Sequence, residues 1–215
     1  MPYTEPVKSS AFRFVVIADQ VDSRTESDRV PLALDALSGV GLLLPYERTA
    51  GDEVQGLAAT GVSVVASVIG LTRLAGWRIG IGFGPVDEPL PESTRAARGD
   101  AYLAARTAIN SARRTPVALA LVAGDSVRDG GYGDLVEDAE TALWLLRSTL
   151  ARRSREGWEL MDLLDQGLTN AQAAERLGIS PSAVSQRLGR AARTESERAA
   201  LLATRLLDRM LEVSP

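Results

Sequence analysis

The stretch LTNAQAAERLGISPSAVSQRLGRA, residues 168–191, constrains the fold more than any other part of the sequence. Thr169 or Asn170 can cap a helix, and Gly178 can end that helix by adopting a left-handed conformation. Ser180 can cap a second helix, and the proline after it suits the first helical position because no N–H is needed there. The stretch therefore predicts two short helices joined by a tight turn.

The apolar residues of this stretch recur on one side of the two predicted helices. They are Ala174, Leu177, Val184 and Leu188, with Ile179 in the turn between the helices. Ala174 is small where the two helices are expected to cross closely. This spacing resembles the helix-turn-helix of bacterial regulators, in the form found in sigma-factor and response-regulator DNA-binding domains.

The outer face of the second helix keeps polar residues, and the resemblance implies that this helix enters the major groove of double-stranded DNA. Gln186 is then expected to pair with adenine, the serines to contact base edges or phosphates, and the arginines to neutralise phosphates. The candidate DNA-binding residues are Ser180, Ser182, Ser185, Gln186, Arg176, Arg187, Arg190 and Arg193. The alternative is a helical hairpin that only packs or dimerises, which would normally carry apolar residues on this face.

The charge distribution also fits a DNA-binding surface. The chain has a net charge of −4, yet between Arg176 and Arg193 there are four arginines and no acidic residue, a local basic patch.

A single small module of this kind binds DNA weakly, so a homodimer is expected. A candidate dimer face on the last predicted helix consists of Ala199, Leu202, Ala203, Leu206 and Met210. The alternative is that these residues are buried within the same subunit.

Residues 11–124 mix strand and helix patterns in the order β-α-β-β-α-β, with additions. This order predicts an α+β fold, with a ferredoxin-like sheet and helices on one face. The alternating glycines of WRIGIGFG leave room for another backbone to approach one strand, and the proline-rich segment 85–92 is expected to be a loop. The remainder is predicted to be helical, with a linker at 125–150 and the helix-turn-helix plus a C-terminal helix at 151–215.

Two aspartates stand at places that this topology brings together. Asp19 lies at the end of the first predicted strand, and Asp52 lies in the turn between the second and third strands. These places are adjacent in a β-α-β-β-α-β sheet, so the two carboxylates can converge on one hard cation such as Mg²⁺. The alternative is structural, because aspartates at strand ends and turns often cap backbone N–H groups. Asp19 can also pair with Arg24.

The segments VVIADQVDSR, AGDEVQGL, WRIGIGFG and GDAYLAARTAI resemble the SatD family of bacterial proteins over residues 12–113. That family is similar to the catalytic core of class III nucleotide cyclases, which has a palm-like fold. The resemblance implies that Asp19 and Asp52 hold metal ions that bind a nucleoside triphosphate. The cofactor-binding residues that it implies are Gln20, Val21, Arg48, Gly51 and Arg106.

The late helix of this region departs from the cyclase pattern. Cyclases place an Asn and an Arg there to stabilise the transition state; this chain offers Arg106, but Tyr102 or Leu103 stands where the Asn is needed. Because such a site acts mainly by stabilising the transferring phosphoryl group, cyclisation is not expected. The sequence favours a bacterial transcriptional regulator whose cyclase-like domain senses a ligand, such as Mg²⁺ with a nucleotide, or mediates dimerisation. The alternative is a nucleotide-processing enzyme whose helical tail serves assembly.

Composition excludes several classes of protein. The chain has no cysteine and no histidine, so disulfides and thiolate chemistry are absent and any metal site needs oxygen ligands. No apolar run reaches the roughly 18 residues of a membrane span. The protein is therefore expected to be cytoplasmic, with no membrane partner.

Overall fold

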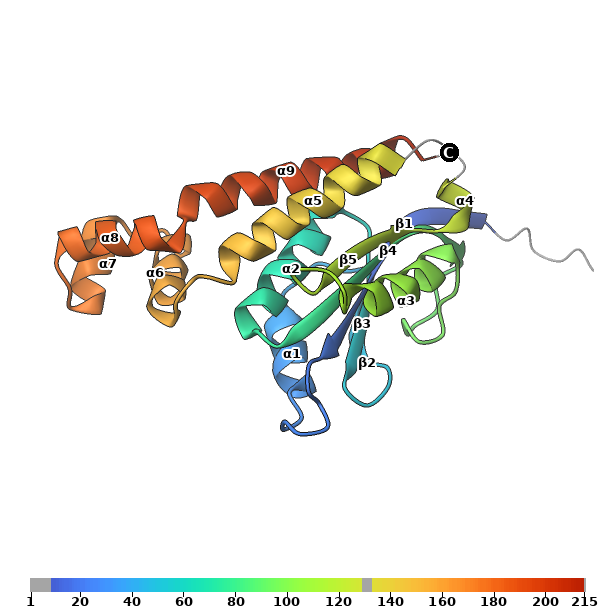
Figure 1. Cartoon of the computed structure of the whole chain (residues 1–215), viewed down its shortest axis with the longest axis horizontal. Coiled ribbons are helices and arrows are strands. Elements are labelled where there is room, and N and C mark those ends of the chain that lie inside the picture. The colour runs from blue at the N-terminus through green and yellow to red at the C-terminus, as the bar shows by residue number, and fades with distance from the viewer. Residues whose placement is uncertain (1–8, 129–132, 215) are drawn as a thin grey trace, which may run out of the picture.

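A five-stranded sheet forms the centre of the structure, a computed structural model that describes residues 9–128 and 133–214 (Figure 1). The strands are β1 (Ser9–Gln20), β2 (Leu44–Arg48), β3 (Glu53–Ala58), β4 (Trp77–Glu88) and β5 (Leu119–Ala123). Their order is β2-β3-β1-β4-β5, antiparallel except for the parallel pair of β4 and β5. The first four strands have the ferredoxin-like order, so the predicted α+β fold is confirmed.

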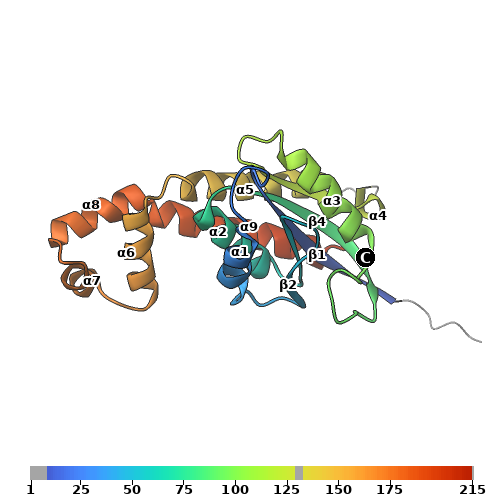
Figure 2. The ribbon, with the colours of Figure 1, turned by 90° about the horizontal axis from the view of Figure 1, so that it is seen from below.

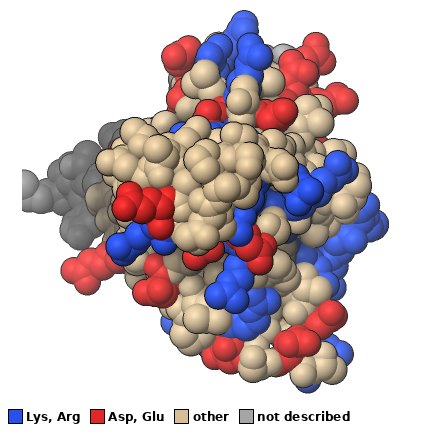
Figure 3. All heavy atoms as spheres, turned by 90° about the vertical axis from the view of Figure 1, so that its left-hand side faces the viewer, with Lys and Arg blue, Asp and Glu red and all other residues tan. Residues whose placement is uncertain are grey.

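Helices surround the sheet and form a separate group at one end. They are α1 (Val30–Leu37), α2 (Gly61–Leu74), α3 (Asp100–Ala112), α4 (Asp125–Arg128), α5 (Gly133–Leu150), α6 (Arg155–Asp165), α7 (Asn170–Leu177), α8 (Pro181–Ala191) and α9 (Arg193–Glu212). The short helices α6, α7 and α8 lie together away from the sheet, and α5 and α9 run side by side from the sheet toward them (Figures 1 and 2). Figure 3 views this end directly. Among the described helices, none is both long and apolar enough to cross a membrane.

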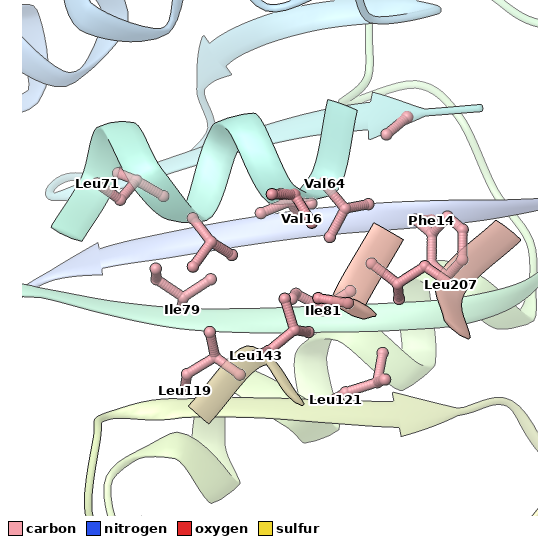
Figure 4. Packing of buried hydrophobic residues seen from close by; sticks show 14 of the residues in the cluster. Phe14, Val16, Val64, Leu71, Ile79, Ile81, Leu119, Leu121, Leu143 and Leu207 are labelled. Atoms are coloured by element: carbon pink, nitrogen blue, oxygen red, sulfur yellow. The ribbon is translucent and has the colours of Figure 1, made fainter. Parts of the chain in front are cut away.

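Both faces of the sheet are covered, which corrects the expectation of helices on one face. On β1, Phe14 and Val16 point toward α1, α2, α5 and α9, and their core is shown in Figure 4. The alternate residues Val15 and Ile17 point to the opposite face, where α3 covers them. Because the central strand is apolar on both sides, a sheet with one bare face would leave half of these residues in water.

The glycines of β4 allow α3 to lie unusually close to the sheet. A Cβ atom added at Gly80 would stand 2.3 Å from the backbone nitrogen of Ile109, and one at Gly82 would stand 2.1 Å from the carbonyl oxygen of Ala101. Both neighbours belong to α3. The predicted close backbone approach along WRIGIGFG is therefore confirmed, and α3 is the element that approaches.

β4 continues into the segment that was expected to be a loop. It extends to Glu88, where its last residue pairs with Ser9 of β1, and it includes Pro85 opposite Phe12. β5 reaches only to the level of Phe83 on its other side. Beyond that point β4 is an edge strand, and an edge tolerates a proline that cannot donate to a neighbouring strand.

Side chains of α5 cover the outer edge of β5. The N–H of Leu121 donates to the Glu140 carboxylate at 2.9 Å, and the Trp144 indole N–H donates to the carbonyl of Leu119 at 2.9 Å. Arg147, which is 8% exposed, donates to main-chain carbonyls just before β5 and at the start of β4. Burial without an acidic partner among these contacts lowers the pKa of Arg147 to about 10. α5 thus satisfies backbone groups that an uncovered sheet edge would leave to another chain.

The stretch 125–150, expected as a helical linker, contributes to the main core. Ala142, Leu143 and Leu146 of α5 are buried in the same apolar cluster as the sheet. The division of the chain into domains at residues 124 and 150 remains our proposal. The packing of α5 favours assigning this helix to the same domain as the sheet.

The C-terminal helix α9 also packs onto this core. Ala203, Leu207 and Met210 are fully buried against it, and the Gly61 N–H at the start of α2 donates to the carboxylate of Asp208 at 2.7 Å. Of the expected dimer stripe, Ala203 and Met210 are therefore buried within the subunit, and Ala199 and Leu206 pack against the same cluster. Leu202 alone of the five remains exposed, at 47%. The alternative of burial within the same subunit holds for most of the stripe, because its periodicity reports an apolar face without saying what covers it.

Candidate nucleic-acid interface

The predicted helix-turn-helix is present as α7 and α8. Thr169 caps α7 by accepting the N–H of Gln172 at 3.3 Å, and the Gln172 side chain accepts the N–H of Thr169 at 2.8 Å. Gly178 ends α7 in the left-handed conformation, at φ 63°. Ser180 then caps α8 by accepting the N–H of Ala183 at 3.2 Å, with a proline at the first helical position. The local signals of the sequence thus specify both helix boundaries.

A small apolar core holds these two helices against α6. Ala174 of α7 and Val184 of α8 are buried together with Leu160 of α6. Leu177 and Leu188 pack against them and are partly buried. The predicted inner face is therefore confirmed, and it fixes which side of α8 faces outward.

The predicted contact residues lie on the outer side of this unit. The exposed ones are Arg176, Ser180, Ser182, Ser185, Gln186 and Arg190, and the half-buried ones are Arg187 and Arg193. All three hydroxyls make local bonds: Ser180 shares a 2.9 Å hydrogen bond with Ser182, and Ser185 donates to a backbone carbonyl at 3.2 Å. Seen end-on, basic side chains gather along one flank of the molecule (Figure 3).

Arg193 differs from the other predicted phosphate contacts because it already has acidic partners. It donates to Glu197 at 2.7 Å and lies 3.9 Å from the carboxylate of Asp165. A phosphate would have to compete with both carboxylates for this guanidinium. Arg193 is therefore less available to a phosphate than an arginine without an acidic partner.

An arginine that the sequence reasoning missed lies beside α8. Arg152, at the joint between α5 and α6, lines a hollow of about 580 Å³ together with Arg187 and Arg190. The signal was the basic run ARRSR at residues 151–155. Only the fold brings this run next to α8, because the two segments are far apart in sequence.

A cluster of paired side chains connects α6 to the end of α2. Arg73 at the end of α2 donates two hydrogen bonds to Asp162 of α6, both at 2.6 Å, and its guanidinium lies 5.2 Å from the ring centre of Trp158. Arg153 lies 4.4 Å from the same ring and donates to the carbonyl of Ala191 at 2.9 Å. Cation–π contacts and a bidentate ion pair are directional. α6 therefore has a defined placement relative to α2.

At one end of the sheet the structure brings Asp19 and Asp52 together, as the topology predicted, and it also brings in arginines. Arg78, the register partner of Asp19 on β4, donates to its carboxylate at 3.0 Å. Arg113 lies 3.9 Å from the same oxygen. The expected partner, Arg24, is exposed and makes none of these contacts.

The two carboxyl groups have opposite pKa shifts. Burial raises the pKa of Asp19 and the neighbouring Asp52 adds to the rise, against the lowering effect of Arg78. A hydrogen bond from Ser23 lowers the pKa of Asp52. Arg78 thus donates to the carboxylate of Asp19, and Ser23 donates to that of Asp52.

This donor set does not fit a divalent cation well. Mg²⁺ needs carboxylate oxygens that are free to turn toward it, whereas the Asp19 carboxylate is held by Arg78. Among the described residues, no group of three or more acidic, histidine or cysteine side chains is placed to hold a metal ion. The arginine partners favour the structural interpretation of Asp19.

Gln20 and Val21, implied as phosphate-binding, have their polar groups engaged. The Gln20 side chain donates to the carbonyl of Ser27 at 2.8 Å and accepts the N–H of Arg29 at 2.9 Å. The backbone N–H groups of both residues donate to main-chain carbonyls, that of Val21 to Gly76 at 2.9 Å. Gln20 therefore holds the loop after β1 through both ends of its side-chain amide.

The other implied cofactor residues are also accounted for by local contacts. Arg48 pairs with Asp28 at 2.5 Å, and Arg106 forms a bidentate pair with Glu53 at 2.5 and 2.9 Å. Gly51 has a positive φ of 50° in the turn between β2 and β3. The geometry places these residues at the same end of the sheet without a free cationic group aimed at a shared site.

Comparison with known families identifies the helical end. The family described as winged helix-turn-helix DNA-binding matches residues 159–193, which span most of α6 and all of α7 and α8. The chain therefore contains a helix-turn-helix DNA-binding domain. No strand follows α8 within residues 193–214, where the chain continues as α9, so this part of the chain lacks the β-hairpin wing.

Comparison with solved structures gives weaker similarities, and the search of curated proteins found no match. A bacterial light-regulated adenylyl cyclase is 18% identical, with a TM-score of 0.39 over 56% of this chain and 45% of that chain. A second structure of a bacterial light-regulated adenylyl cyclase is 16% identical, with a TM-score of 0.39 over 60% and 47%. The regulator of polyketide synthase expression from Bifidobacterium adolescentis is 17% identical, with a TM-score of 0.28 over 94% and 82%. The chain spans about half the length of the cyclases.

Proposed function

We propose that this protein is a transcriptional regulator that reads double-stranded DNA through α8. The observation that carries the proposal is the outer face of the helix-turn-helix, where Ser182, Gln186 and Arg190 are exposed above a complete apolar core. A helix pair that served packing alone would carry apolar residues at these positions. Exposed hydroxyl, amide and guanidinium groups are the ones that contact base edges and phosphates in the major groove.

Binding to genomic DNA tests this function directly. The purified protein is mixed with sheared DNA from its own genome, washed at near-physiological salt, and the retained DNA is sequenced. A few sharp, palindrome-like peaks would support a sequence-reading regulator that binds as a homodimer. Flat retention that disappears with added salt would mean that the basic surface attracts DNA without reading its sequence.

Substituting Gln186 with alanine tests the base-reading role within the strongest genomic site. Gln186→Ala should weaken binding to that site by about 1–3 kcal/mol and relax the preference at one base position, because a bidentate amide contact to adenine is lost. Fluorescence anisotropy with the site and with random duplex measures both affinities.

The matched control is Gln166→Ala, which makes the same change at an exposed residue at the end of α6. This variant should bind both duplexes as the unchanged protein does. An equal loss of affinity of Gln186→Ala for the specific and the random duplex would contradict base reading by Gln186.

Ligand sensing at the sheet end is tested separately by thermal unfolding. Mg²⁺ with ATP or GTP is expected to leave Tm unchanged, because Arg78 already neutralises the Asp19 carboxylate. A ligand that binds the folded state would raise Tm with its concentration. A rise that Asp52→Asn abolishes would contradict this expectation and support a nucleotide sensor, and steady turnover of either nucleotide would support the enzyme alternative.

A further inference from the structure

The hollow between the α5–α6 joint and α8 is a basic concave surface. Three arginines, Arg152, Arg187 and Arg190, face its volume of about 580 Å³. Glu156 is the single acidic residue in its lining. The lining of the hollow therefore carries more positive than negative side chains.

These arginines are not used to hold the fold together. Within residues 9–128 and 133–214, neither Arg152 nor Arg190 donates a hydrogen bond or forms an ion pair. Two nearby arginines are engaged: Arg73 pairs with Asp162, and Arg153 donates to the carbonyl of Ala191. Two cationic groups without partners on one concave surface are available to a ligand.

Glu156 does not cancel this surface. Its pKa is lowered mainly by hydrogen bonds at the start of α6, from its own backbone N–H and from Ser154, and further by Arg187 and Arg155. Glu156 is thus ionised at neutral pH, and its negative charge partly offsets the positive charge of Arg187. Neither Arg152 nor Arg190 is among the groups that act on Glu156.

The position of the hollow relates it to DNA. Arg187 and Arg190 lie on the C-terminal half of α8, one helical turn from each other, and Gln186 precedes them on the same helix. A helix that enters the major groove has the sugar–phosphate backbone at its margins. Guanidinium groups bind phosphate oxygens in a planar, bidentate manner, which suits a pocket lined by arginines.

We propose that this hollow holds a phosphate of the duplex backbone, so that the DNA-contacting surface extends beyond the helix-turn-helix to Arg152 at the α5–α6 joint. The inference rests on the proposed function. It adds a contact outside residues 159–193, the part of the chain that matches the DNA-binding family. It also makes the placement of α6 against α5 part of the DNA-binding surface.

The test compares Arg152→Gln with the unchanged protein on the specific and the random duplex over a series of salt concentrations. Affinity should fall about tenfold, and equally for both duplexes, because a charged hydrogen bond to the backbone is lost without any base contact. The slope of log affinity against log salt should become shallower by about 0.9, the value for one phosphate contact. Arg152→Lys should keep most of the salt slope, since the charge remains.

Arg205→Gln is the matched control, because it removes the same charge from the exposed face of α9, outside the hollow. It should leave the salt slope unchanged. Circular dichroism of each variant confirms the fold. An Arg152→Gln variant with the affinity and slope of the unchanged protein would overturn the proposal, while Gln186→Ala would still report on base reading.

Free inorganic phosphate is the other ligand with the chemistry that this hollow would bind. If inorganic phosphate raises Tm in the unchanged protein but not in Arg152→Gln, and DNA affinity is the same in both, the hollow binds free phosphate and the duplex assignment is wrong. If the unchanged protein binds no DNA in the genomic experiment, the proposed function fails first, and this inference fails with it.

Discussion

Leu207→Ala is expected to lower the free energy of unfolding by about 2–5 kcal/mol, the range for removing a large buried aliphatic side chain. Leu207 is fully buried in the main core, where it lies near Phe14 of β1 (Figure 4). Its Cβ also lies where the start of α2 approaches α9 at Gly61, so the surrounding backbone has little freedom to fill the cavity. Urea unfolding followed by circular dichroism measures the change.

Leu201→Ala is the control on the same helix, because Leu201 is 51% exposed. Its effect should stay within about 0.5 kcal/mol, as for surface substitutions in general. Equal effects of the two substitutions would contradict the packing of α9 on the sheet. A loss in Leu207→Ala that shrinks as protein concentration rises would show that α9 packs between subunits instead.

The helix-turn-helix could be predicted closely because its signals are local. The caps at Thr169 and Ser180, the left-handed Gly178 and the small Ala174 each act within a few residues. Such signals specify helix boundaries and the buried side without knowledge of the rest of the fold. The strand order of the sheet could also be predicted, because few topologies suit that sequence of elements.

The partners of the sheet-end carboxylates could not be predicted, because they depend on register. From the sequence, Arg24, five residues away, was a candidate ion-pair partner of Asp19. In the structure the partner is Arg78, which lies opposite Asp19 on the paired strand β4. A shift of one residue in that pairing would turn Arg78 to the other face of the sheet. The topology therefore predicted that Asp19 and Asp52 lie close together, but it did not predict the arginine that pairs with Asp19.

Hydrophobic periodicity likewise does not show what covers the apolar face of a helix. The apolar faces of α5 and α9 were visible in the sequence, but the pattern is the same whether a sheet or a second subunit covers them. Only the structure shows Leu143 and Leu207 in one core with β1. Arg152 was missed for a related reason, since a basic run in a predicted joint is ordinary until the fold sets it beside α8.

Gly82→Ala is expected to destabilise the protein by about 1–3 kcal/mol or more, although it adds only one methyl group. The new Cβ would stand 2.1 Å from the carbonyl oxygen of Ala101 and 2.2 Å from the nitrogen of Ala105, both in the backbone of α3. A flexible side chain could turn away from such a contact, but a helix backbone cannot. α3 would have to shift from the sheet and expose Val15 and Ile17, which it covers. Urea unfolding measures the loss.

Gly84→Ala and Gly39→Ala separate this clash from the general effect of replacing glycine. At Gly84 the nearest atom would be 3.2 Å away, and at Gly39 nothing lies within 4 Å. Alanine also restricts the unfolded chain, which stabilises the folded state by about 0.4–1 kcal/mol where the backbone allows it. The order of stability should therefore be Gly39→Ala, then Gly84→Ala, then Gly82→Ala. If Gly82→Ala were as stable as Gly39→Ala, the close approach of α3 to β4 would be wrong.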